Sequence, residues 1–256
     1  MWPALLACGW LLVSVVWAAE DALLTVEPDR PDISNSTHTV PVRALQVELG
    51  LEYARSHDPS ERRLALQTTL RTGLSDRLEV RLDGVPLVRL KEASDDLGLG
   101  DFAPGVKYRV FEPPAGQGWP ALGIQPFVKI PTARVPIGTG RLDAGLLVLV
   151  DQDLPGALQL TVNTGLVAVG QPHGALLQGL ASASVSREFR GRLKPFFEMF
   201  FASRDEREGH DTLGLDTGFV YLLTRRVAVD AAAETTLNRR RPDYALRTGL
   251  SLLLGR

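Results

Sequence analysis

Apolar and polar residues alternate along most of this chain, and this two-residue period limits its fold more than any other feature. Near the start of the pattern, Leu45 and Val47 alternate with Gln46 and Glu48. Because successive side chains of a β-strand point to opposite faces, such a segment forms a strand with one apolar and one polar face. The pattern predicts twelve strands, which centre on residues 45–53, 64–74, 78–82, 106–110, 122–130, 142–148, 158–166, 181–189 (the least regular), 193–201, 213–223, 227–233 and 244–254.

Two folds use strands of this kind: a water-soluble sandwich or barrel, and a membrane barrel with its polar face inward. The connections favour the membrane barrel, in which short turns on one side alternate with longer loops on the other. An even number of strands also returns the chain to the side from which it started. We therefore predict an all-β fold, a closed antiparallel transmembrane β-barrel of about 12 strands over residues 41–256. Tight connections are expected at residues 75–77, 190–192 and 224–226, and longer ones at 56–61, 89–96, 132–140, 203–211 and 238–243.

The first nineteen residues form a separate segment. It has no charged side chain, contains a short apolar core and ends in Ala18-Ala19 before Glu20. An apolar segment this short is typical of a secretory signal peptide rather than a membrane anchor, so we expect residues 1–19 to be removed on export. Cys8, the only cysteine, lies in this segment, which leaves the exported chain without disulfides or thiolate ligands. After this segment no apolar run reaches the ~20 residues of a spanning helix, so the chain would cross a membrane as strands.

A membrane barrel would turn its polar parity toward an enclosed interior. Charged residues of both signs have this parity. They could form a charged constriction that selects solutes. Alternatively they pair across neighbouring strands, since buried charges must be paired or hydrated, and we favour pairing for most of them. These candidate pore-lining residues are Glu48, Glu52, Arg71, Glu79, Arg81, Lys107, Arg109, Lys129, Arg141, Asp143, Lys194, Glu198, Asp216, Asp230, Glu234 and Arg247.

The segment of residues 20–40 is polar, contains prolines and lacks the alternation. It could fold into the lumen as a plug, or it could remain a periplasmic tail. Asp29, Arg30 and Asp32 are the candidate plug residues, because an arginine between two carboxylates suits docking to a charged interior.

Several short blocks along the chain resemble those of a known family. In their order, they resemble outer-membrane barrel transporters that are named for the meta pathway of phenol degradation. The blocks cover nearly the whole chain after residue 28 and are Asp29-Arg30-Pro31-Asp32, Thr39-Val40-Pro41, Leu45-Gln46-Val47-Glu48-Leu49-Gly50, Gly98-Leu99-Gly100-Asp101, Gly105-Val106-Lys107-Tyr108-Arg109, Gln125-Pro126-Phe127-Val128-Lys129-Ile130-Pro131-Thr132, Asp216-Thr217-Gly218 and Arg241-Pro242-Asp243-Tyr244.

The resemblance implies a signal-bearing barrel in the outer membrane of a Gram-negative bacterium. Its partners would be outer-membrane lipid, the barrel-insertion machinery and a small solute, including aromatic or other hydrophobic compounds. The resemblance carries no evidence that phenol itself is the solute.

Signals for other functions are weak. The four histidines, at positions 38, 57, 173 and 210, are scattered without metal-ligand spacing on one element. The sequence has neither a serine elbow nor a phosphate-binding glycine loop, and a net charge of −2 offers no electrostatic reason to bind nucleic acid. We therefore predict an outer-membrane channel or transporter for small solutes, with no catalytic residue, metal or cofactor. The alternatives are a lipid-facing outer-membrane enzyme and a soluble periplasmic β-protein that binds a hydrophobic ligand in its core.

Overall fold

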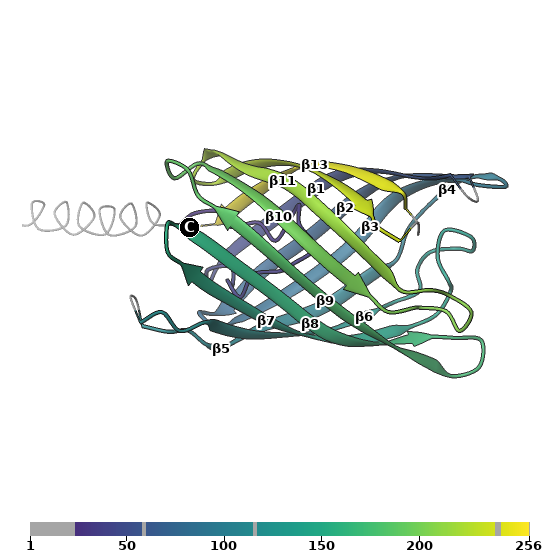
Figure 1. Cartoon of the computed structure of the whole chain (residues 1–256), viewed down its shortest axis with the longest axis horizontal. Coiled ribbons are helices and arrows are strands. Elements are labelled where there is room, and N and C mark those ends of the chain that lie inside the picture. Colours follow the sequence, from purple (N-terminus) through teal and green to yellow (C-terminus); the bar gives the residue numbers. More distant parts are fainter. Residues whose placement is uncertain (1–23, 58–59, 115–116, 239–241, 256) are drawn as a thin grey trace, which may run out of the picture.

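The computed structural model describes residues 24–57, 60–114, 117–238 and 242–255, so the predicted signal peptide lies outside the described residues. Within these ranges, every regular element is a β-strand. Twelve tilted strands surround one axis (Figure 1). They are β1 (Ala44–His57), β2 (Ser60–Ser75), β3 (Leu78–Lys91), β5 (Phe102–Phe111), β6 (Ala121–Lys129), β7 (Asp143–Leu154), β8 (Leu158–Gly170), β9 (Ala175–Arg187), β10 (Leu193–Ala202), β11 (Thr212–Thr224), β12 (Val227–Thr236) and β13 (Tyr244–Gly255).

Antiparallel pairing closes these twelve strands into a ring. Each strand pairs with its neighbours in sequence, and β13 returns to β1 in the register that sets Leu49 opposite Leu250. The short strand β4 (Asp95–Gly98) pairs with the last residues of β3 alone, so β3 and β5 are neighbours in the ring. The fold prediction is confirmed, with β4 as one additional strand. Closure matters because an open sheet edge would leave unpaired backbone groups in lipid.

The two ends of the barrel differ in their connections. At the turn end, strands are joined by residues 76–77, 112–120, 155–157, 188–192 and 225–226. The loop end carries longer connections at residues 92–101, 130–142 and 203–211 and a short one at 171–174. The turn-end connection at residues 112–120 is as long as that at 203–211, so the predicted alternation of short and long connections is only partly followed. The first residue of β1 and the last residue of β13 both lie at the turn end, where Ala44 is opposite Gly255.

The first connection at the loop end is not the long loop that we expected. β1 and β2 stay paired as far as His57 and Ser60, so most of residues 56–61 belongs to the strands.

Burial in this barrel is the reverse of that in a water-soluble protein. Leu51 and Phe197 are each 52% exposed on the outer surface, whereas Arg71 is 1% and Lys107 0% exposed in the interior. A soluble sandwich or barrel would bury its leucines and solvate its charges, so this arrangement excludes that alternative. No helix in the described ranges is both long and apolar enough to cross a membrane.

Two local expectations differ from the structure. β9 begins at Ala175 and is longer than the segment 181–189; its inner face carries the buried Ser182, Ser184 and Ser186, which contrast weakly with alanines on the outer face. Arg141 does not lie on a strand, because β7 begins at Asp143.

Candidate functional site in the barrel interior

An N-terminal segment, residues 24–42, lies inside the turn-end half of the barrel (Figure 1, purple). Near its start, the backbone amide of Val26 donates to the carbonyl of Arg225 at 2.7 Å. Apolar contacts add to this attachment. Val26 and Val40 pack in a small buried cluster with Ala44, Ala228 and Leu253. The segment is therefore held to the wall near both of its ends.

Asp29 lies at the centre of three cations from neighbouring strands. Its Oδ2 accepts hydrogen bonds from Nζ of Lys107 at 2.6 Å and from Nη1 of Arg81 at 2.8 Å, and it lies 3.5 Å from Nη2 of Arg71. All four side chains are buried. Burial alone raises the pKa of Asp29, but the three cations outweigh it and hold that pKa well below the ordinary 3.8. Asp29 is therefore an ionised anchor.

Arg71 joins two strands to the segment. Its Nε and Nη2 donate to the two carboxylate oxygens of Glu79 at 2.8 and 3.0 Å, and its Nη1 donates to Oε1 of Glu48 at 3.0 Å. The same Nη1 donates to the backbone carbonyl of Glu27 at 3.0 Å. Glu79 in turn accepts the backbone amide of Val40 at 2.8 Å. These charged side chains thus hold the segment at two separate points.

Arg30 lies against a pair of glycines. Gly50 on β1 and Gly249 on β13 face each other in register, and a Cβ atom at either position would overlap the Arg30 guanidinium. From this position Nε and Nη2 of Arg30 donate to the two carboxylate oxygens of Asp230 at 3.0 and 3.2 Å. The missing side chains therefore provide the space in which this bidentate pair forms.

The next part of the segment uses its backbone amides. Ser34 donates to Glu198 at 2.8 Å, Asn35 to Asn163 at 2.7 Å, and Thr37 to Asp151 at 2.6 Å. The three acceptors lie on β10, β8 and β7. Since buried backbone amides need partners, these polar side chains of the wall replace the hydrogen bonds of regular secondary structure.

Most of the other predicted interior residues form ion pairs with residues on neighbouring strands. Arg247 Nη2 donates to Asp216 at 2.6 Å and to Glu234 at 2.9 Å. Further ion pairs join Lys129 to Asp143 and Glu52 to Arg63 on neighbouring strands, whereas Arg109 pairs with Glu112 three residues along the chain. Arg141 is the exception already noted, and Lys194 donates to the amide oxygen of Gln159 at 2.7 Å.

The segment separates two cavities. The turn-side cavity, of about 530 Å³, reaches residues of the turns such as Ala157 and Glu188. The loop-side cavity, of about 390 Å³, reaches Asp83 on β3 and Phe127 on β6. Residues 29, 30 and 32 line both cavities. The three candidate plug residues thus lie in the partition between them.

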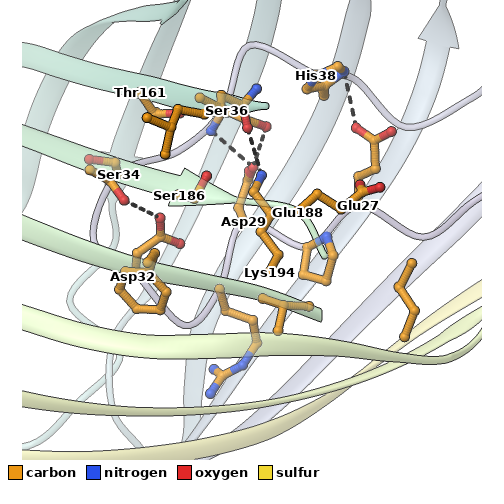
Figure 2. Close-up of a pocket in the computed structure, with 18 of the residues that line it drawn as sticks. Glu27, Asp29, Asp32, Ser34, Ser36, His38, Thr161, Ser186, Glu188 and Lys194 are labelled. Carbon is orange, nitrogen blue, oxygen red and sulfur yellow. Dashed lines mark hydrogen bonds and ion pairs between the residues drawn. The ribbon is translucent and has the colours of Figure 1, made fainter. Parts of the chain in front are cut away.

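Asp32 lines the turn-side cavity together with Ser34 and Lys194 (Figure 2). Its Oδ2 accepts the hydroxyl of Ser184 at 3.2 Å. Burial, together with the nearby Glu198 carboxylate, raises the pKa of Asp32 well above 3.8. The two acidic residues of the partition therefore have opposite electrostatic environments.

A comparison with protein families matches residues 28–254 to the family described as "Putative MetA-pathway of phenol degradation". The chain belongs to this family. No curated protein sequence matches it. The family resemblance inferred from the sequence blocks is therefore confirmed.

Solved structures share the fold of this family member at low sequence identity. An outer membrane channel from Pseudomonas putida F1 is 14% identical, with a TM-score of 0.64, over 89% of this chain and 100% of the other. The KdgM porin is 7% identical, with a TM-score of 0.55, over 81% of this chain and 98% of the other. The chain therefore has the fold of outer-membrane channels and porins.

Four polar residues that hold the N-terminal segment of this family member were not predicted from the sequence. Gln46, Asp151 and Asn163 bond the N-terminal segment, and Ser184 bonds Asp32. All have the inward parity of their strands, so parity alone could have located them. Gln46, Asn163 and Ser184 were not predicted because only charged residues were taken as candidates. Asp151 is charged but was not among the candidates either.

Proposed function

We propose that this protein is an outer-membrane channel for small solutes. The observation that carries the proposal is the reversed burial: leucines cover the outside of a closed ring while carboxylates, arginines and lysines occupy its inside. An apolar outer band suits lipid, and a polar lumen suits passage of hydrated or polar solutes.

The comparisons support this proposal. A protein of the same fold is an outer membrane channel, and the KdgM porin has been solved with disordered oligogalacturonate. The family description refers to phenol degradation, which extends the proposed solutes to aromatic and other hydrophobic compounds. No observation favours a catalytic role, so we propose a channel that is not an enzyme.

Within this channel, the N-terminal segment acts as an internal plug. Asp29, Arg30 and Asp32 line the cavities on both of its sides, so a solute that crosses the lumen must pass beside them or displace them. The charged residues of the wall serve chiefly to hold this plug and to pair across strands, as the contacts of Arg71 and Glu198 illustrate.

Ionic current in a planar bilayer tests the proposal. The wild type should show small or infrequent conductance steps, and Arg30→Ala should show larger or more frequent ones, because it frees one anchor of the plug. Liposome swelling with matched aromatic and aliphatic solutes then gives the solute class. If heat-shifted gel mobility shows folded barrels and neither form conducts over many insertions, the channel proposal is wrong.

A further inference from the structure

Lys194 differs from the other inward-facing cations of the strands. Arg63, Arg71, Arg81, Lys107, Arg109, Lys129 and Arg247 each have a carboxylate within 4.0 Å. Lys194 instead donates to the neutral amide oxygen of Gln159 at 2.7 Å, and no carboxylate of the described residues lies within 4.0 Å of its ammonium. A half-buried ammonium without a counter-ion is costly unless an anion or water completes its environment.

This ammonium lies in the wall of the turn-side cavity (Figure 2). Beside it the wall is apolar, formed by Phe196, Val220, Leu222 and Leu158. Gly218 faces Phe196 across the β10–β11 pair. The cavity thus combines one cation with an apolar surface, and its volume of about 530 Å³ is within the range of small-molecule sites.

The hydroxyl groups of the cavity add hydrogen-bonding capacity. Ser186 lies opposite Phe196 in the β9–β10 pair, and Thr161 lines the same cavity from β8. The Thr161 hydroxyl already donates to Asp151, so the Ser186 hydroxyl is the neutral group that a ligand head group held by Lys194 would meet.

The acidic residues of this cavity leave the ammonium available. Asp29 is engaged by its three cations, and Glu27 pairs with His38 at 3.1 Å. Asp153, near the end of β7, and Glu188, in the turn region after β9, are both exposed, so solvent screens them. Asp32 is the acidic residue that remains inside. Burial and the Glu198 carboxylate raise its pKa and outweigh the Lys194 ammonium, which lowers it, so the pKa stays raised and favours the neutral form.

We propose that the turn-side cavity binds a small organic carboxylate with an apolar body, with the carboxylate on Lys194 and the body against Phe196, Val220 and Leu222. The inference rests on the proposed channel function and names the class of solute that its interior would retain. Charge-assisted hydrogen bonds to a half-buried ammonium supply the preference for the anion, and the apolar wall supplies the preference for a hydrophobic body.

Three probes of one shape test this proposal: 3-phenylpropanoate, 3-phenylpropan-1-ol and 3-phenylpropylamine. Isothermal titration of the full-length folded barrel in detergent should give a Kd for the carboxylate about tenfold or more below that of the alcohol, as expected for a charge-assisted hydrogen bond. The amine should bind most weakly. If the wild-type barrel binds the carboxylate and the alcohol with equal affinity, or shows no saturable binding of the carboxylate, the proposal is wrong.

Variants then locate the binding site. Lys194→Met keeps an apolar stem of similar length and should lose the preference for the carboxylate, whereas Lys194→Arg should retain it. Arg192→Met changes an exposed cation at the edge of the same cavity and should leave the preference in place. If Lys194→Met keeps the preference, Lys194 is not the binding group and the proposed site is wrong.

These outcomes are distinguishable from failure of the channel proposal. A barrel that conducts ions but does not bind the carboxylate supports the channel proposal and refutes the proposed site. A barrel that binds the carboxylate but never conducts ions supports the proposed site and refutes the channel proposal.

Discussion

The carboxylate of Asp29 accepts a hydrogen bond from the ammonium of Lys107 at 2.6 Å, although 78 positions separate the two residues. Lys107 belongs to the wall, on β5, and Asp29 belongs to the segment that lies in the turn-end half of the interior. This contact couples the position of the segment to the integrity of the barrel, and it makes both properties measurable through single substitutions.

Replacement of Asp29 by Asn should destabilise the folded barrel. It leaves Arg71, Arg81 and Lys107 buried around a neutral side chain, and loss of one partner of a buried ion pair costs about 3–5 kcal/mol. Chemical unfolding in detergent, followed by gel mobility, measures the change. Asp153→Asn, at an exposed position near the end of β7, is the matched control and should leave the unfolding midpoint unchanged. Equal midpoints for the two variants would contradict the anchoring role.

The contribution of Asp29 should depend on pH in a defined direction. Because its pKa is lower in the folded protein than the ordinary 3.8, its stabilisation is present above that pH and is lost as the pH falls below it. The difference in stability between wild type and Asp29→Asn should therefore be constant near neutral pH and shrink as the pH drops below about 4. A difference that stays constant down to pH 2 would show that ionisation of Asp29 is irrelevant.

The contribution of Asp32 to stability should depend on pH in the opposite direction. Its pKa is raised in the folded protein, so its favourable contribution is present below pH 3.8 and is lost as the pH rises through the folded-state pKa. Asp32→Asn should therefore raise the unfolding midpoint at pH 7 and have little effect at pH 3. Unfolding curves at the two pH values measure this, and a lower midpoint at pH 7 would refute the prediction.

A methyl group at either glycine beneath Arg30 should release that side chain. Gly50→Ala places a Cβ where only the guanidinium lies, so it should increase ionic current as Arg30→Ala does. Gly249→Ala also brings its Cβ to 2.6 Å from the backbone carbonyl oxygen of Leu49, so it should increase the current and strain the β1–β13 pair as well. Addition of Arg30→Ala to Gly50→Ala should produce little further change, because both alter one contact. Gly179→Ala is the control, since its Cβ would meet its nearest atom at an ordinary 3.8 Å. Fully additive effects of Gly50→Ala and Arg30→Ala on the ionic current would mean that Gly50→Ala does not act through Arg30.

An arginine on the outer surface should reveal the lipid-facing band. Leu49 lies near the middle of β1 and is exposed, so Leu49→Arg should cost about 2–4 kcal/mol on folding into a bilayer. Leu97→Arg introduces the same side chain on β4, which is outside the ring of twelve strands, and should cost much less. Folding yield into vesicles across a urea series compares them, and similar losses would argue against a membrane band at Leu49.

The face of each strand and the number of strands in the ring could both be predicted from the order of the amino acids. The two-residue period is a property of the extended backbone, so the outward position of Leu49 and the inward position of Glu48 could be predicted from their parity alone. The period was least informative in β9, where serines and alanines share the two faces.

Which interior groups meet depends on the three-dimensional fold. Parity places Lys107 and Lys194 alike on the inner face, yet Lys107 meets Asp29 while Lys194 meets an amide oxygen in a cavity. The position of residues 24–42 also depends on contacts with strands that are distant in sequence, such as β7 and β10. Alternation is a local property of the chain, whereas pairing depends on closure of the ring, which brings together side chains that no local pattern relates.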